Sequence, residues 1–163
     1  VVAWMAGKTE ILKAMYRNEG LVMRPGIMEL LDDAAWQGVP VCLVTSTERE
    51  VAALGLSVIG LDKRISARVC YEDVANRKPA PDPYLLAAKR LGVPPERCLA
   101  LEDSPNGVKS AVAAGAVTVA LIGMISKPTL IAAGASRCVH SLAELVPLNI
   151  QPGATSTFRR LKS

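Results

Sequence analysis

Aromatic residues make up only 4% of the 163-residue chain, and its net charge of +4 is spread thinly along the sequence. A small basic cluster at Arg159, Arg160 and Lys162 is the exception. Nucleic-acid surfaces combine a basic stripe with interleaved aromatic residues, so we expect no nucleic-acid partner. The longest weakly polar run, Ala111 to Ile125, is shorter than the roughly 18 to 20 residues that a membrane span needs, so we expect no membrane span.

Histidine and paired cysteines are scarce as well. His140 is the only histidine, which argues against a Ser-His-Asp triad, a Cys-His dyad or a histidine-rich zinc site. The four cysteines, at positions 42, 70, 98 and 138, form no CxxC pair. Three of them lie in apolar, strand-like runs, where free cysteine behaves as a small buried hydrophobe. This usage indicates a reducing compartment, either cytoplasm or plastid stroma.

Half of the residues are apolar, and they form short runs that alternate with amphipathic stretches. We expect strands at 39–44, 67–70, 97–101, 116–122 and 137–139, and helices at 7–17, 25–37, 83–91, 106–114, 128–133 and 141–145. Strands that alternate with helices of this length predict a doubly wound parallel α/β sheet. Its right-handed crossovers would place every carboxyl-terminal strand end at one edge.

The tripeptide Thr45-Ser46-Thr47 follows the first of these strands. Hydroxyls and backbone N–H groups at a strand-to-helix turn suit a phosphate or another oxyanion. An equally good interpretation is plain helix capping, with Thr47 as the N-cap and Glu50 completing a capping box.

Charged residues stand at two further positions on the same predicted edge. Lys78 precedes the helix at 83–91, where it can neutralise phosphate charge, although a lone lysine there is commonly a solvated surface residue. Glu102 and Asp103 directly follow a buried strand, where two carboxylates are costly unless they are paired or metal-bound. Such ligands suit Mg²⁺, and capping of the next helix is the alternative. Together these groups favour phosphoryl chemistry.

Three segments carry a resemblance to a known family: Val41 to Thr47, Lys78 to Tyr84 (KPAPDPY) and Leu99 to Gly107 (LALEDSPNG). Together they resemble the haloacid dehalogenase superfamily, in particular its beta-phosphoglucomutase-like and CbbY-like phosphatase branch. Segments 8–10 and 21–26 are similar to the return from cap to core in CbbY-like phosphatases, including plastid ones. The run from His140 to Leu145 resembles the closing strand and helix.

The resemblance implies a role for each matching residue. Thr45 would hydrogen-bond the transferring phosphoryl group with help from the backbone N–H of Ser46, and Lys78 would neutralise that group and hold the nucleophile. Glu102 and Asp103 would bind or orient Mg²⁺, whereas Asp82 would cap its helix and support the Lys78 loop. The implied activity is hydrolysis of a small sugar phosphate through an aspartyl-phosphate intermediate.

The family's first motif, a DxD sequence that ends its first strand, occurs nowhere in this chain. That strand would lie between the strands at 39–44 and 97–101, so we expect an open slot there. Unpaired buried backbone groups cost about 1 to 3 kcal/mol each. The resemblance therefore divides the chain into a remnant of the helical cap (1–20), an α/β core without its nucleophile strand (21–147) and a tail (148–163).

Three explanations for the missing motif stay open at this point. The sequence can be part of a longer phosphatase, with a small phosphorylated metabolite as its substrate. It can be a degenerate, structural subunit whose slot a partner protein or a rearranged strand fills. The basic tail at 159–162 would then be a docking segment, although a frayed terminus is the commoner explanation of such a tail. It can also be a related scaffold with another function. Without a nucleophile, we expect the chain by itself to be catalytically inactive.

Overall fold

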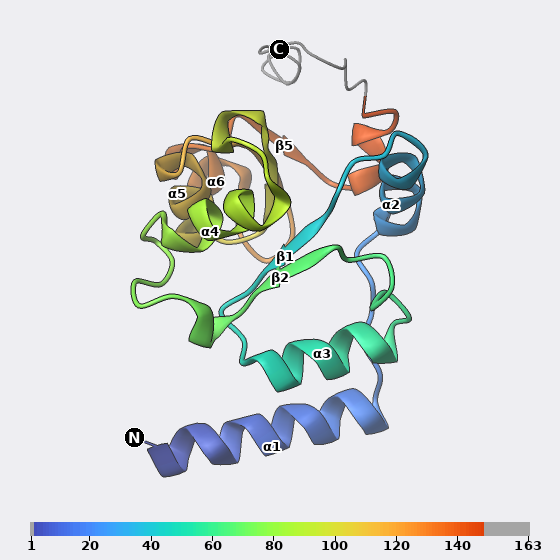
Figure 1. Ribbon diagram of the computed structural model, residues 1–163, viewed down its shortest axis with the longest axis vertical. Coiled ribbons are helices and arrows are strands. Elements are labelled where there is room, and N and C mark those ends of the chain that lie inside the picture. The colour runs from blue at the N-terminus through green and yellow to red at the C-terminus, as the bar shows by residue number, and fades with distance from the viewer. Residues whose placement is uncertain (1, 149–163) are drawn as a thin grey trace.

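The computed structural model describes the backbone of residues 2–148 and the side chains of residues 9–148 (Figure 1). The helices are α1 (Val2–Asn18), α2 (Ile27–Trp36), α3 (Arg49–Val58), α4 (Asp82–Leu91), α5 (Pro105–Ala113) and α6 (Lys127–Ala132). The strands are β1 (Cys42–Val44), β2 (Ala67–Val69), β3 (Leu99–Glu102), β4 (Val117–Leu121) and β5 (Arg137–Val139). Three 3-10 turns complete the order: η1 (Tyr71–Asp73), η2 (Pro95–Arg97) and η3 (Leu142–Leu145). Strands and helices alternate as the sequence predicts.

The strands form two separate parallel sheets, one of β1 and β2 and the other of β3, β4 and β5. Within the sheets Leu43 lies opposite Arg68, and Ala100 lies opposite Thr118. β1 and β3 are not hydrogen-bonded to each other. The predicted slot is therefore present: the α/β fold is confirmed, and its parallel sheet is interrupted where the family's first strand was expected.

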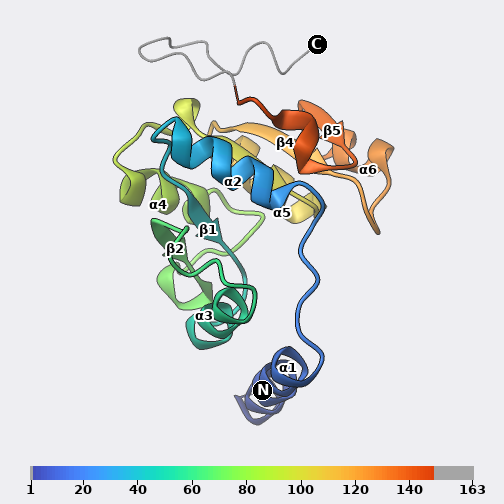
Figure 2. The same cartoon turned by 90° about the vertical axis from the view of Figure 1, so that its right-hand side faces the viewer.

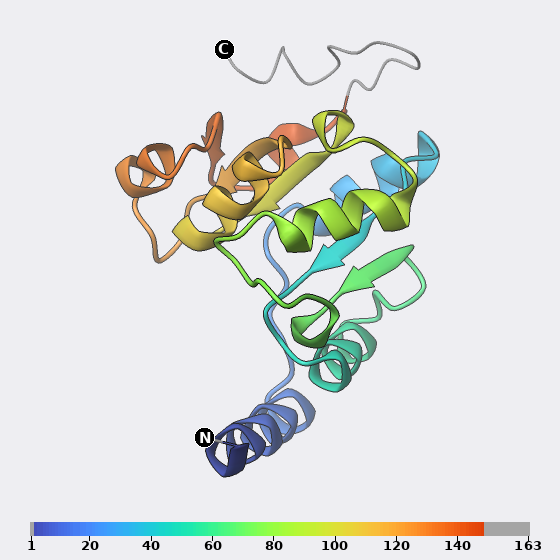
Figure 3. The same ribbon diagram turned by 60° about the vertical axis from the view of Figure 1, so that its left-hand side comes forward.

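Helices on both faces hold the two sheets together across this gap. On one face α2 contributes Leu30 to a cluster with Val119 and Val139, and Leu31 to a cluster with Leu56 and with Leu43 of β1. On the other face α4 packs against β1, β2 and α5. Figure 3 shows α4 in front of the strands and α2 behind them. These two helices thus make the connection that the missing hydrogen bonds do not.

The gap is an apolar cavity of about 470 Å³. Its walls come from α2, β1, α3, α4 and β3, and include Leu30, Leu31, Val44, Leu56, Ala88 and Leu101.

Backbone hydrogen bonds show which backbone groups face this cavity. The carbonyl of Val41 and the N–H of Thr45 hydrogen-bond to β2 and the residues beside it. Because backbone groups alternate sides along a strand, the N–H and C=O groups of Cys42 and Val44 point toward the cavity. The same alternation, starting from Cys98 bonded to β4, turns Leu99 and Leu101 toward the cavity.

Helix α1 lies at one end of the molecule, connected to α2 by an extended segment (Figure 2). It packs on α3, where the Thr9 hydroxyl donates to Glu48 at 2.7 Å. Lys13 forms an ion pair with Glu50 at 2.7 Å, and Gly55 lets the Tyr16 ring approach closely. Within residues 2–148 no helix is both long and apolar enough to cross a membrane.

Several element boundaries differ from the expectation. The N-cap of α3 is Glu48 and not Thr47, and the Glu48 side chain makes no capping hydrogen bond. The Thr47 N–H donates to the Thr45 hydroxyl in a local turn. The expected helix at 141–145 is the 3-10 turn η3, which Ser141 caps. The predicted tail at 148–163 lies outside the described residues apart from Leu148.

Candidate active site

Lys78 lies at the mouth of the gap and bridges its two sides. The loop before α4 carries it, and its ammonium donates to the backbone carbonyl of Val44 at 3.1 Å. The same ammonium forms a short hydrogen-bonded ion pair with the carboxylate of Glu102 on β3. Both side chains are nearly buried, with exposures of 12% and 7%. The Lys78 ammonium therefore gives the Val44 carbonyl the hydrogen-bond donor that a central strand would otherwise provide.

The carboxylate of Glu102 lies in a socket made by four other residues. Its Oε1 accepts from Lys78 and, at 2.5 Å, from the hydroxyl of Tyr84 on α4. Its Oε2 accepts from the Ser104 hydroxyl at 3.3 Å. A Cβ on Gly107 would come within 1.9 Å of this carboxylate, so only glycine leaves it room. Both oxygens of Glu102 are thus engaged by protein donors.

Thr45 and Ser46 follow β1 directly, one and two residues after the carbonyl that Lys78 binds. The Thr45 N–H donates to Val69 at 2.9 Å, and its hydroxyl accepts from the N–H of Thr47 at 3.0 Å. Ser46 is exposed. The structure therefore brings Thr45, Ser46 and Lys78 to one edge of the sheet. Their role in binding phosphate stays a prediction.

The expected magnesium ligands point in different directions. Glu102 is turned inward to Lys78, whereas Asp103 is about half exposed and pairs with Arg24 at 2.9 Å. Arg24 comes from the segment that joins α1 to α2. Within the described part of the chain no three histidine, cysteine or acidic residues are grouped to hold a metal ion. The described residues alone do not fit a magnesium site, because Glu102 faces Lys78 and only Asp103 of the two expected ligands is open to solvent.

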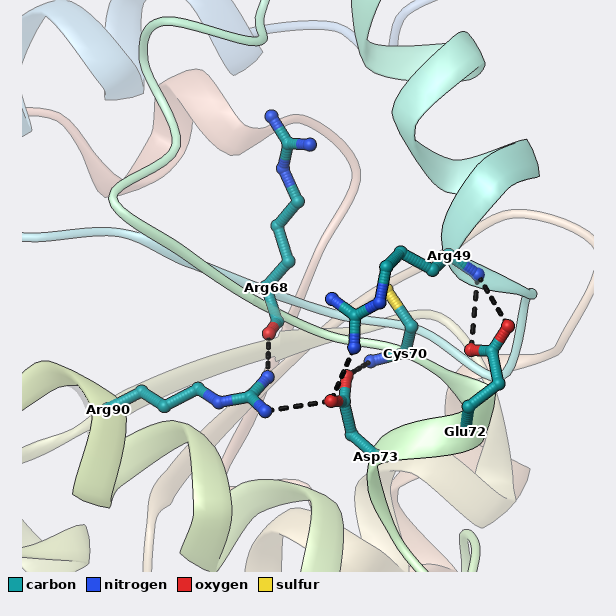
Figure 4. A network of polar contacts seen from close by, with 6 residues as sticks. All are labelled: Arg49, Arg68, Cys70, Glu72, Asp73 and Arg90. Atoms are coloured by element: carbon teal, nitrogen blue, oxygen red, sulfur yellow. Dashed lines mark hydrogen bonds and ion pairs between the residues drawn. The ribbon is translucent and has the colours of Figure 1, made fainter.

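A second network of polar contacts fixes the loops on either side of the site (Figure 4). The Asp73 carboxylate, 7% exposed, accepts from Arg49 at 2.5 Å and from Arg90 at 2.7 Å. It also accepts from the N–H of Cys70 at 2.7 Å, and Glu72 accepts from the N–H of Arg49.

The ion pairs of this network shift the pKa of the Asp73 carboxyl. The Arg90 guanidinium above all holds this pKa well below its usual range, despite burial. This clasp ties the start of α3, which follows Thr45 and Ser46, to the loop that leads to Lys78.

Sequence reasoning missed Tyr84, Gly107 and Arg24. Tyr84 lies six residues after Lys78, a spacing that by itself indicates no contact with the strand at 97–101. The two expectations for Asp82 have different outcomes. It is the first residue of α4 and not its N-cap, but it accepts from Asn76 at 2.9 Å, a contact within the loop that carries Lys78, as expected. The signal for Gly107 was weak, because a helical glycine shows no positive φ.

Comparison with known proteins places the chain in a family. Residues 2–115 match the family model described as haloacid dehalogenase-like hydrolase. The chain belongs to the haloacid dehalogenase-like hydrolases. It is 37% identical over 141 residues to protein CbbY of Cereibacter sphaeroides, across 85% of this chain and 61% of that protein. It is 38% identical over 113 residues to hexitol phosphatase A of Escherichia coli (strain K12), across 69% of the chain and 52% of that phosphatase.

A solved structure agrees with this assignment. A CbbY mutant from Rhodobacter sphaeroides, crystallised in complex with xylulose-(1,5)bisphosphate, superimposes with a TM-score of 0.80 and 33% identity. The match covers 87% of this chain and 64% of that one. The CbbY-like branch and its α/β fold are therefore confirmed. The chain spans about half to two thirds of the length of these relatives.

Proposed function

We propose that this chain supplies the phosphate-binding part of a phosphatase that hydrolyses small sugar phosphates. The observation that carries the proposal is Lys78, whose ammonium joins the end of β1 to the end of β3 beside Thr45. A cation, the hydroxyl of Thr45 and the N–H of Ser46 at one sheet edge suit a phosphoryl group, whose transfer depends on positioning and charge neutralisation. The phosphatase names among its relatives support the substrate class.

In this proposal each residue acts on the phosphoryl group or on its position. Thr45 and the N–H of Ser46 donate hydrogen bonds to its oxygens, and Lys78 neutralises its charge. Asp103, which is about half exposed and pairs with Arg24, would contribute to a Mg²⁺ site, with further oxygen ligands from outside the described residues. Bound there, Mg²⁺ would neutralise phosphoryl charge. A reducing compartment, cytoplasm or plastid stroma, belongs to the same proposal because the four cysteines are free.

The nucleophile must come from an additional strand, because the chain has no DxD sequence. A parallel strand between β1 and β3 would satisfy the backbone groups of Cys42, Val44, Leu99 and Leu101 and fill the apolar cavity. Its carboxyl end would emerge beside Lys78. An aspartate there would attack phosphorus, form an aspartyl phosphate and release the sugar hydroxyl, and water would then free inorganic phosphate.

The proposal is tested by adding that strand as a peptide. The purified chain is mixed with an apolar peptide that ends in Asp-x-Asp, with Mg²⁺ and p-nitrophenyl phosphate. We expect no turnover by the chain alone, turnover with the peptide, and none with Lys78→Ala or with a peptide whose first Asp is Asn. A peptide that binds the chain without any turnover would contradict the phosphatase proposal and favour a structural subunit. Turnover by the chain alone, abolished by Lys78→Ala, would contradict the need for an added strand.

A further inference from the structure

Glu102 and Asp103 are adjacent in sequence, but the fold gives them opposite environments. Asp103 is about half exposed, whereas the Glu102 side chain is 7% exposed. Burying a carboxylate costs several kcal/mol unless charge and hydrogen bonds compensate it. The Lys78 ammonium provides the charge, and the hydroxyls of Tyr84 and Ser104 provide the further donors. Protein donors therefore engage both oxygens of the Glu102 carboxylate.

Tyr84 contacts both members of the ion pair. Its hydroxyl donates to Glu102 at 2.5 Å, and its ring centroid lies 5.2 Å from the Lys78 ammonium, within the range of a cation–π contact. Burial first, and then the Glu102 carboxylate, raise the pKa of Tyr84 far above its usual value. The hydroxyl therefore stays protonated at neutral pH and remains a donor. Tyr84 thus fixes the positions of both the Glu102 carboxylate and the Lys78 ammonium.

We propose that Glu102 is the positioning residue of Lys78 and not a metal ligand, and that Tyr84 holds Glu102 in that role. The inference deepens the proposed function, because it concerns the lysine that would neutralise the phosphoryl group. With Glu102 locked by Tyr84, Ser104 and the space at Gly107, Lys78 has one position, at the mouth of the gap. Preorganised charges of this kind need no rearrangement when a transition state forms.

The test measures how fast Lys78 reacts with an amine-acylating reagent, sulfo-N-hydroxysuccinimide acetate, by peptide mass spectrometry. The exposed Lys109 on α5 gives the reference rate within the same molecule. In the wild-type chain we expect Lys78 to be protected relative to Lys109. Tyr84→Phe removes one hydrogen bond to a charged group and should raise the Lys78 to Lys109 ratio by about five-fold or more. Tyr16→Phe, on α1, is the matched control and should leave the ratio unchanged.

Two further measurements separate positioning from metal binding. Gly107→Ala keeps every charge and places a methyl group where the Glu102 carboxylate lies, so it should raise the ratio about as much as Glu102→Gln does. Saturating Mg²⁺ should leave the wild-type ratio unchanged. An unchanged ratio in folded Tyr84→Phe would overturn the proposal. So would a rise on adding Mg²⁺ that Glu102→Gln abolishes, since Glu102 would then leave Lys78 for the metal.

Lysine reactivity does not depend on turnover, so this result stands apart from the test of the proposed function. A chain that shows protected Lys78, and responds to Tyr84→Phe, supports the positioning role even if the added strand gives no activity. Circular dichroism of each variant verifies that it is folded. If Gly107→Ala fails to fold, Tyr84→Phe still decides, because it changes a single oxygen atom.

Discussion

Asp73 illustrates how one buried carboxylate can hold two loops of this molecule. It pairs with arginines from α3 and α4 and accepts from the backbone at Cys70 (Figure 4). Removing the charge by Asp73→Asn leaves both guanidinium groups without their charged partner. Hydrogen bonds to charged groups contribute about 1.5 to 3 kcal/mol. We expect Asp73→Asn to lower the free energy of unfolding by about 2 kcal/mol at pH 7, measured by urea denaturation.

The pH dependence of this loss follows from the direction of the pKa shift. The pKa of Asp73 is lowered in the folded state, mainly by Arg90. Its stabilisation is therefore fully present above the unfolded pKa of about 3.9, and it is lost as the pH falls further toward the folded value. The difference between wild type and Asp73→Asn should shrink below pH 4. Asp62→Asn, at an exposed position, serves as the control. A difference that stayed constant down to pH 2 would show that the clasp is not ionic.

At the scale of elements, α2 begins at a glycine that two constraints fix. Gly26 has a φ of +82°, and a Cβ there would lie 2.1 Å from the backbone nitrogen of Ala143 in η3. Gly38, just after α2, has a φ of +68° and no atom within 4 Å of its Cβ position. A comparison of Gly26 with Gly38 therefore separates the cost of a left-handed backbone, which both share, from the cost of close packing, which only Gly26 has.

Alanine at these two glycines should therefore give unequal losses of stability. Gly38→Ala should cost about 1 to 2 kcal/mol, the penalty of a left-handed conformation with a side chain. Gly26→Ala adds a steric conflict with η3 and should cost about 3 kcal/mol or more. Thermal and urea unfolding of the two variants measures the difference. Equal losses would mean that η3 moves away from α2 at little cost.

The same elements show what the sequence could and could not predict. The strand at 137–139 was predicted to the residue. Those at 39–44 and 97–101 were predicted to within a few residues, because buried parallel strands are largely continuous apolar runs. Thr45, Ser46 and Lys78 were brought together because the strand ends of such a fold share one edge. The inward turn of Glu102 was not predictable, because it depends on a tyrosine from another element and on the absence of a side chain at Gly107.

At the scale of the whole molecule, the two sheets are joined by helices and not by backbone hydrogen bonds. A cavity of about 470 Å³ with apolar walls leaves side-chain contacts unmade between β1 and β3. Anything that binds the folded chain and not the unfolded chain stabilises it. A strand that fits this cavity should therefore raise the stability of the entire domain, whether or not it carries a nucleophile.

We expect an apolar strand peptide at about 100 times its dissociation constant to add about 2.7 kcal/mol to the free energy of unfolding. In a domain of this size that corresponds to a rise of roughly 5 to 10 °C in the melting temperature. Amide hydrogen exchange should slow at Cys42, Val44, Leu99 and Leu101, whose N–H groups face the cavity. A peptide with proline at its centre is the control, since proline cannot donate to a ladder. Stabilisation without slower exchange at these four amides would mean that the peptide binds elsewhere, and that the two sheets do not form one continuous sheet around it.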